Sequence, residues 1–170
     1  AKLGGVRDAV PVGVSVGLQK SDELLHEKVA GYLEDGYARV KIKIKPGRDV
    51  EMLAGLRERF PDTAFMVDAN SAYSLADASR LRELDALDLM MIEQPLAHDD
   101  FLDHARLQEE LETPICLDES VKSVDGVRLA LELGSCRIVN IKPGRVGGHA
   151  SSRRIHDLMR NKMDVVREDV

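Results

Sequence analysis

The chain has 170 residues, with 24 Lys and Arg against 30 Asp and Glu, so its formal net charge is −6 at pH 7. This charge argues against a nucleic-acid partner, because phosphate binding needs a basic surface. With 44% hydrophobic and 32% charged residues, the composition is that of a globular chain and excludes disordered and fibrous proteins. No apolar run approaches the roughly 20 residues of a membrane-spanning helix, and residues 1–5 lack the apolar segment of a signal peptide, so we expect no membrane partner and a cytoplasmic protein.

Six short runs rich in Val and Ile are each followed by a turn and a segment with helical periodicity, which is typical of a βα array. Helix N-caps are predicted at Ser21, Ser74 and Ser123, where a side-chain oxygen can accept hydrogen bonds from the first amides. Gly36 and Gly134 stand where helices are expected to end. The predicted strands cover residues 11–17, 39–45, 64–68, 89–92, 115–118 and 137–142.

Strands that alternate with helices imply right-handed crossovers and a parallel sheet, either doubly wound or closed into a barrel. Charged residues end five successive predicted strands at intervals of 25, 25, 25 and 24 residues: Lys43, Asp68, Glu93, Asp118 and Lys142. A barrel gathers many strand ends onto one face, whereas a doubly wound sheet forms its site at one switch point. The spacing therefore favours a (β/α)8 TIM-type barrel.

This barrel is expected to be partial, because a (β/α)8 barrel typically needs about 250 residues. The last predicted helix covers residues 151–160, and only residues 163–166 are candidates to begin a seventh strand. We therefore expect an α/β fold of about six βα units with parallel strands. Such a sheet would expose two edges, so either the chain is a fragment or something else covers those edges.

The segment Lys41-Ile42-Lys43-Ile44-Lys45 alternates cationic and apolar residues, so its three lysines share one face of the predicted strand. The apolar face must lie under the helices, which turns the lysines toward the barrel interior. Crowding of cations and loss of water would both lower a lysine pKa toward the range of a general base, which makes Lys43 the candidate base. The alternative is an edge strand whose lysines extend into solvent and discourage aggregation.

Three carboxylates, those of Asp68, Glu93 and Asp118, follow three successive strands and have no basic neighbour in the sequence. Three such charges do not converge without a cation, and all-oxygen ligands suit Mg²⁺, with Mn²⁺ as a possible substitute. Asn70 and Glu119 are candidates for supporting partners of these ligands. The alternative is that each acidic residue only caps the helix that follows.

Lys142 lies in the segment Asn140-Ile141-Lys142-Pro143-Gly144, and barrel closure would place it across the mouth from Lys43. A metal flanked by two lysines can remove the proton from either face of a carbon next to a carboxylate, while the metal stabilises the enediolate. A solvated lysine at a strand end is the alternative. Asn140 is a further candidate supporting partner, and Ser15 on the first predicted strand is a candidate substrate contact. The glycine-rich segment 144–148 is interpreted as a tight turn, since it lacks the pattern of a phosphate loop.

Five motifs resemble those of the enolase superfamily, muconate-cycloisomerase subgroup, in order and spacing: Lys41-Ile42-Lys43, Asp68-Ala69-Asn70, Glu93-Gln94-Pro95, Leu117-Asp118-Glu119-Ser120 and Asn140-Ile141-Lys142-Pro143. Within that subgroup the resemblance is nearest to the o-succinylbenzoate synthase and N-acylamino acid racemase family, over residues 4–158.

The resemblance implies that Lys43 and Lys142 are the acid/base groups on opposite faces of the substrate, and that Lys41 tunes Lys43 and touches the substrate carboxylate. It also implies that the three carboxylates hold Mg²⁺. The reaction implied is Mg²⁺-dependent abstraction of the proton α to a carboxylate through an enediolate. Its two forms are racemisation of an N-acyl amino acid and dehydration to o-succinylbenzoate, a step of menaquinone synthesis.

Members of this family carry an N-terminal capping domain before the eight-unit barrel. We therefore expect residues 1–170 to be an incomplete C-terminal barrel domain, with the capping domain and the last barrel units absent. A dipeptide epimerase or a muconate-type cycloisomerase shares the same site plan and remains an alternative. An alternative from another class is a catalytically inactive metal-binding fragment that self-associates through its open sheet edges. We expect a small-molecule carboxylate substrate and a homo-oligomer.

Overall fold

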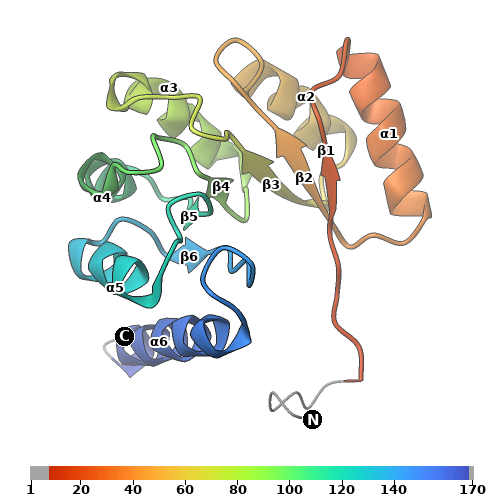
Figure 1. The fold of residues 1–170 in the computed structure, drawn as a ribbon. Coiled ribbons are helices and arrows are strands. Elements are labelled where there is room, and N and C mark those ends of the chain that lie inside the picture. The colour runs from red at the N-terminus through yellow and green to blue at the C-terminus, as the bar shows by residue number, and fades with distance from the viewer. Residues whose placement is uncertain (1–7, 169–170) are drawn as a thin grey trace.

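The computed structural model describes residues 8–168 and the side chains of residues 8–161, so the opening segment 1–5 lies outside the described residues. All the strands of this region belong to one sheet and run parallel, and each pairs with the next in chain order. They are β1 (Val14–Val16), β2 (Arg39–Lys43), β3 (Ala64–Asp68), β4 (Ile92–Glu93), β5 (Ile115–Leu117) and β6 (Ile138–Val139). Figure 1 shows the strands on an inner arc and the helices on an outer arc. The prediction of a partial barrel with six parallel βα units is confirmed.

The helices between the strands begin and end largely where the sequence predicts. They are α1 (Asp22–Glu34), α2 (Val50–Arg59), α3 (Ala78–Arg82), α4 (Phe101–Glu110), α5 (Val124–Leu133) and α6 (His149–Glu168), and the 3₁₀ turns η1 (Leu75–Asp77) and η2 (Glu83–Leu87) flank α3. Ser21 Oγ accepts from the amide of Leu24 at 3.3 Å, and Ser123 Oγ accepts from that of Gly126 at 3.0 Å. Gly134 ends α5 with a φ of +75°, which a residue with a side chain rarely adopts.

Several predicted strand limits are wrong. The predicted strand 11–17 shortens to β1, in part because Pro11 has no amide hydrogen to donate to a neighbouring strand. The predicted strand 89–92 shifts to β4 at Ile92–Glu93. The predicted strand 137–142 shortens to β6, and beyond it the chain turns at Lys142, where the Arg145 amide donates to the Lys142 carbonyl at 2.9 Å.

The predicted start of a seventh strand at residues 163–166 is also wrong, because these residues lie inside α6. The helix continues through them, since residues 149–168 contain neither Gly nor Pro to end it. Within the described part of the chain, β6 is therefore the last strand of the sheet.

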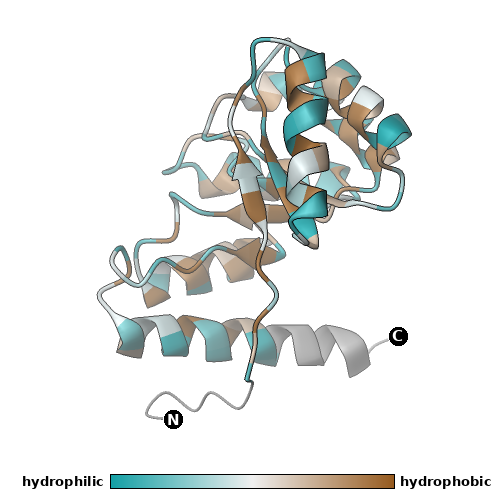
Figure 2. Cartoon of the chain, turned by 90° about the vertical axis from the view of Figure 1, so that its right-hand side faces the viewer, coloured by the Kyte–Doolittle hydropathy of each residue, from teal (hydrophilic) through white to brown (hydrophobic). Residues whose placement is uncertain are grey.

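The two faces of β2 differ as predicted. Val40 and Ile42 are buried under the helices, with exposed fractions of 0% and 1%, whereas Lys41 and Lys43 lie on the other face and remain partly exposed. Figure 2 shows the matching pattern on the helices, where hydrophobic and hydrophilic bands alternate along α1. The apolar core thus lies between sheet and helices, and the cationic face of β2 lines the inside of the arc. Of the helices in the described region, none combines the length and apolar character needed to cross a membrane.

Candidate active site

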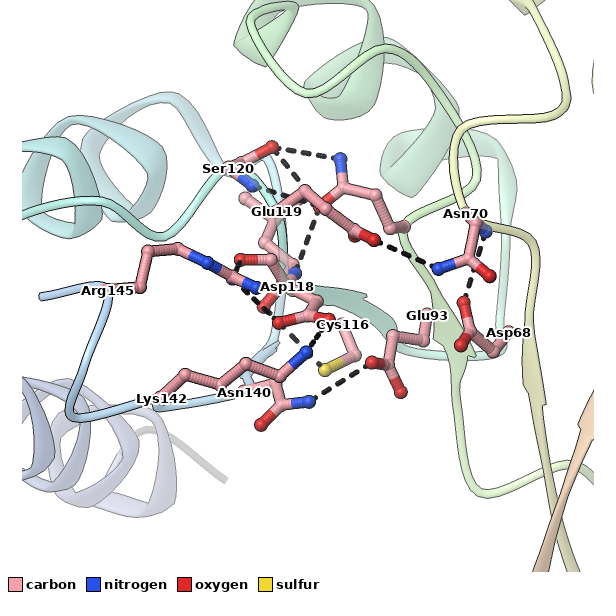
Figure 3. Close-up of polar contacts among 12 residues, drawn as sticks. Asp68, Asn70, Glu93, Cys116, Asp118, Glu119, Ser120, Asn140, Lys142 and Arg145 are labelled. Atoms are coloured by element: carbon pink, nitrogen blue, oxygen red, sulfur yellow. Dashed lines mark hydrogen bonds and ion pairs between the residues drawn. The ribbon is translucent and has the colours of Figure 1, made fainter. Parts of the chain in front are cut away.

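The carboxyl ends of neighbouring strands bring the predicted site residues together. In the strand register, Lys43 is opposite Asp68, and Asp68 is opposite Glu93. Asp118 follows the last residue of β5, two positions after Cys116, which is opposite Glu93. Because paired strands lie about 4.8 Å apart, the three carboxylates occupy adjacent positions at one end of the sheet, and Figure 3 shows them side by side.

One lysine ammonium bridges two of these carboxylates. Lys41 Nζ lies 2.6 Å from Glu93 Oε2 and 3.7 Å from Asp68 Oδ2. Burial raises the pKa of Glu93, whose side chain is fully buried, although hydrogen bonds from Lys41 and from Asn140 Nδ2 at 3.1 Å oppose this rise. Burial alone would lower the pKa of Lys41, but the hydrogen bond to Glu93 and the charges of the three carboxylates raise it above its usual value. The lowering of lysine pKa values predicted for this strand face therefore does not hold at Lys41, because burial here brings anions with it.

The end of β3 is joined to the end of β5 by two of the predicted supporting residues. Asp68 Oδ1 accepts from the amide of Asn70 at 3.1 Å, and Asn70 Nδ2 donates to Glu119 Oε1 at 2.9 Å. Glu119 Oε2 is buried without a hydrogen-bond partner among the described residues. Lys43 Nζ approaches Asp68 Oδ2 at 3.4 Å, and its side chain is 38% exposed.

Asp118 is held by two cations on the β6 side. Its Oδ2 accepts from Lys142 Nζ at 2.6 Å and its Oδ1 from Arg145 Nη1 at 2.7 Å, and Arg145 also donates to the Asp118 carbonyl. Figure 3 shows both cationic side chains reaching Asp118 from the same side. Burial opposes ionisation of Asp118, but the hydrogen bonds from Lys142 and Arg145 outweigh it and lower the pKa of this carboxyl. The Lys142 side chain is 50% exposed.

Sequence reasoning missed two residues of this region. Arg145 lies in the segment interpreted only as a tight turn, and its position three residues after Lys142 was the available signal. Gln94 is fully buried, and its side chain binds the turn that follows β5. A polar residue at a buried strand end, between Glu93 and a proline, was the signal for that role.

The donor chemistry fits a hard divalent cation, although the present spacing does not form a complete metal site. Nowhere in the described region do three His, Cys, Asp or Glu side chains lie close enough together to hold a metal ion. Each site carboxylate is neutralised by a Lys or Arg instead, and two of the three already converge on the ammonium of Lys41. Carboxylate oxygens are the ligands that Mg²⁺ prefers. A cation bound here would therefore share these carboxylates with the Lys and Arg side chains that neutralise them now.

A cavity of about 540 Å³ hollows the inner face of the sheet beside these residues. Ser15 on β1 lines it and lies in register with Lys41, which also lines it together with Glu93 and Asn140. Met66, Met90 and Met91 add an apolar portion to its wall. The structure thus brings the predicted substrate contact Ser15 into the same cavity as part of the carboxylate and lysine cluster, whereas Lys43 and Lys142 lie outside its lining.

Comparison with known proteins places this arrangement in a family. Residues 24–163 match the family model described as enolase C-terminal domain-like. The o-succinylbenzoate synthase of Geobacillus kaustophilus is 58% identical over 156 residues, and the N-succinylamino acid racemase of Thermus thermophilus is 57% identical over 156 residues. Each alignment covers 92% of this chain and 42% of the relative.

Solved structures give the same result. An enolase-superfamily member from Enterococcus faecalis has a TM-score of 0.91 and 50% identity, and the alignment covers 94% of this chain and 43% of that one. The muconate lactonizing enzyme from Pseudomonas fluorescens has a TM-score of 0.87 and 25% identity, with 94% and 45% of the two chains covered. The present chain therefore spans less than half the length of these relatives, which are TIM-barrel enzymes of the superfamily. On its sequence, its six-stranded sheet and the residues at its strand ends, the chain belongs to the enolase C-terminal domain-like family.

Proposed function

We propose that this chain forms the catalytic part of an o-succinylbenzoate synthase or N-succinylamino acid racemase, which abstracts the proton α to a substrate carboxylate. The observation that carries the proposal is the order of charges along the strand ends. Lys43 ends β2, Lys142 follows β6, and the three strands between them end in or are followed by Asp68, Glu93 and Asp118. A row of carboxylates with a lysine on each side supports proton transfer to and from either face of the carbon next to a substrate carboxylate.

In this proposal the residues have separate roles. Asp68, Glu93 and Asp118 would hold Mg²⁺, which when bound supplies positive charge to stabilise negative charge on the substrate carboxylate. Lys43 and Lys142 would each take or return a proton, and both side chains are partly exposed, at 38% and 50%. Lys41 would balance the charge of Glu93 and Asp68 and contact the substrate carboxylate.

The degree of similarity supports these two activities over the alternatives in the same subgroup. Relatives named o-succinylbenzoate synthase or N-succinylamino acid racemase are 48–58% identical, whereas the muconate lactonizing enzyme is 25% identical. The substrate expected is a small carboxylate that carries a succinyl group, because the names of both groups of relatives contain it. Ser15, Lys41 and Asn140 line the cavity in which such a molecule would contact the site.

The activity is best tested in a chimera, because the chain spans 42% of its relative. The aligned segment of the Geobacillus kaustophilus enzyme is replaced by that of this chain, and racemisation and o-succinylbenzoate formation are both measured. Lys43→Ala and Lys142→Ala should each reduce racemisation by at least about a hundredfold, because a racemase needs a proton acceptor on each face. Lys45→Ala is the matched control, since this exposed lysine follows β2 on the same face. Racemisation retained in either test variant would reject the assignment of the two bases.

Metal binding is tested on the chain itself. Titration calorimetry with Mg²⁺, with circular dichroism to confirm folding, should detect binding that Asp118→Asn weakens by about tenfold or more, because one ligand is lost. Asp125→Asn is the control, since Asp125 is an exposed carboxylate in the first turn of α5. Equal Mg²⁺ affinity in wild type and Asp118→Asn would contradict the assignment of Asp118 as a ligand.

A further inference from the structure

Gln94 combines a strained main chain with a completely buried polar side chain. It follows the last residue of β4, its exposed fraction is 0%, and its φ is +40°. For a residue with a side chain, this left-handed conformation costs about 1 kcal/mol or more of free energy. Such strain persists only where surrounding contacts hold it, so the contacts of Gln94 identify what the conformation serves.

The side-chain amide of Gln94 binds three atoms of the turn after β5. Its Oε1 accepts from the amides of Asp118 at 2.9 Å and Ser120 at 3.2 Å, and it also lies 3.2 Å from Ser120 Oγ. Its Nε2 donates to Ser120 Oγ at 2.9 Å and to the Leu96 carbonyl at 3.2 Å. The turn therefore receives from one side chain the hydrogen bonds that a neighbouring strand would otherwise supply.

The main chain of Gln94 extends the same linkage to both neighbouring strands. Its amide donates to the Cys116 carbonyl of β5 at 2.8 Å, and its carbonyl accepts from the Ser71 amide after β3 at 2.8 Å. One residue thus joins the ends of β3, β4 and β5, which are the three strands that carry the site carboxylates.

The position of the Asp118 carboxylate depends on this turn. Lys142 and Arg145 contact Asp118 from the β6 side, whereas Gln94 contacts its amide from the β4 side. Without the side-chain oxygen of Gln94, the main-chain amides of Asp118 and Ser120 would lose their acceptor. Each buried amide left without an acceptor costs about 1–3 kcal/mol. The turn would then rearrange to reach other acceptors or water, and the carboxylate would move with it.

We propose that Gln94 is a positioning residue that holds the turn 118–120 so that the Asp118 carboxylate lies beside Glu93 and within reach of Lys142. This inference rests on the proposed function only in taking Asp118 as a metal ligand. The hydrogen bonds of Gln94 to the turn are independent of any metal.

The chain offers a matched control in a second buried glutamine. Gln108 on α4 is 5% exposed, and its Oε1 accepts from the Ile115 amide at 2.7 Å. Its Nε2 donates to the carbonyls of Leu111 and Thr113, each at 3.3 Å. Gln108 therefore supports the amino end of β5 with the same kind of bonds that Gln94 makes beyond the carboxyl end. Gln108→Leu should reduce stability without affecting the site.

The test compares Gln94→Leu, Gln94→Glu and Gln108→Leu in two measurements. The first is native-state amide hydrogen exchange by NMR. Gln94→Leu should reduce the protection of the Asp118 and Ser120 amides by about tenfold beyond any loss shared by the whole chain. Gln108→Leu should leave these two amides unchanged relative to the whole chain and affect the Ile115 amide instead. Gln94→Glu keeps an acceptor oxygen in place, so it should preserve protection of the Asp118 amide even if Gln94→Leu does not fold.

The second measurement is Mg²⁺ affinity by titration calorimetry of the folded variants. Gln94→Leu should weaken binding by about tenfold, equivalent to ~1.4 kcal/mol, while Gln108→Leu should bind as the wild type does. Unchanged protection of the Asp118 and Ser120 amides in Gln94→Leu, or equal losses of Mg²⁺ affinity in Gln94→Leu and Gln108→Leu, would overturn the inference. A folded wild-type chain that binds no Mg²⁺ would instead overturn the proposed metal site, and the exchange measurement would still decide the role of Gln94.

Discussion

Two lysines on the same face of β2 should differ sharply in their contribution to stability. Lys41 and Lys43 are two residues apart, and each lies within 4 Å of a site carboxylate. Their partners differ in burial, because the Glu93 side chain is 0% exposed and that of Asp68 is 10% exposed. We expect Lys41→Met to destabilise the chain much more than Lys43→Met does.

The magnitudes follow from the two geometries. Removing one partner of a buried ion pair typically costs 3–5 kcal/mol, because the remaining charge stays buried. Lys41 is 19% exposed and Asn140 still donates to Glu93, so we expect a loss of about 2–4 kcal/mol for Lys41→Met. Lys43 is 38% exposed at 3.4 Å from Asp68, and pairs of this kind contribute about 1 kcal/mol or less.

Urea unfolding followed by far-UV circular dichroism at neutral pH measures both losses. Glu93→Gln supplies the control, because Lys41→Met should cost much less in a chain whose buried partner carries no charge. If Lys41→Met and Lys43→Met reduce the free energy of unfolding equally, the reasoning from burial is wrong. The same conclusion follows if the loss caused by Lys41→Met is independent of the charge at Glu93.

Three further predictions concern residues outside the carboxylate cluster. Arg57 donates to four main-chain carbonyls at 2.8–2.9 Å, those of Leu87, Asp88, Pro61 and Thr63. Arg57→Ala should therefore lower the free energy of unfolding, measured in urea, by about 2–4 kcal/mol. A loss below about 1 kcal/mol would contradict this prediction. Ser123→Ala should cost about 1 kcal/mol through loss of the α5 N-cap, and Ser123→Gly only a few tenths, measured the same way; equal losses would refute the capping role. Burial lowers the pKa of His104, whose Nε2 accepts from the Leu96 amide at 3.3 Å. As the pH falls, His104 is therefore protonated in the unfolded chain before it is protonated in the folded chain. The stability due to neutral His104 is lost as pH falls below about 6.5. His104→Gln should therefore flatten the decline of the urea midpoint between about pH 7 and pH 5, and an unchanged decline would exclude this contribution.

Much of the fold was predictable because its determinants are local. The alternation in Lys41-Ile42-Lys43 follows from the two-residue period of a strand, and the buried fractions of Val40 and Ile42 agree with it. The caps Ser21 and Ser123 act within three residues of their own positions. Strand limits were less predictable, because β4 and β6 are each only two residues long.

The sequence alone determined the order of the βα units, the two faces of β2 and the position of charged residues at successive strand ends, because all of these depend on short-range periodicity and on regular spacing. Only the tertiary structure showed that Lys41 bridges Glu93 across 52 residues of sequence, and that Gln94 supports the turn at Ser120 across 26. Such contacts depend on strand register and on the curvature of the sheet, which together decide which side chains meet. The tertiary structure also decided the pKa of Lys41. Burial by itself lowers a lysine pKa, but here it also places carboxylates around Lys41, and their charges raise its pKa.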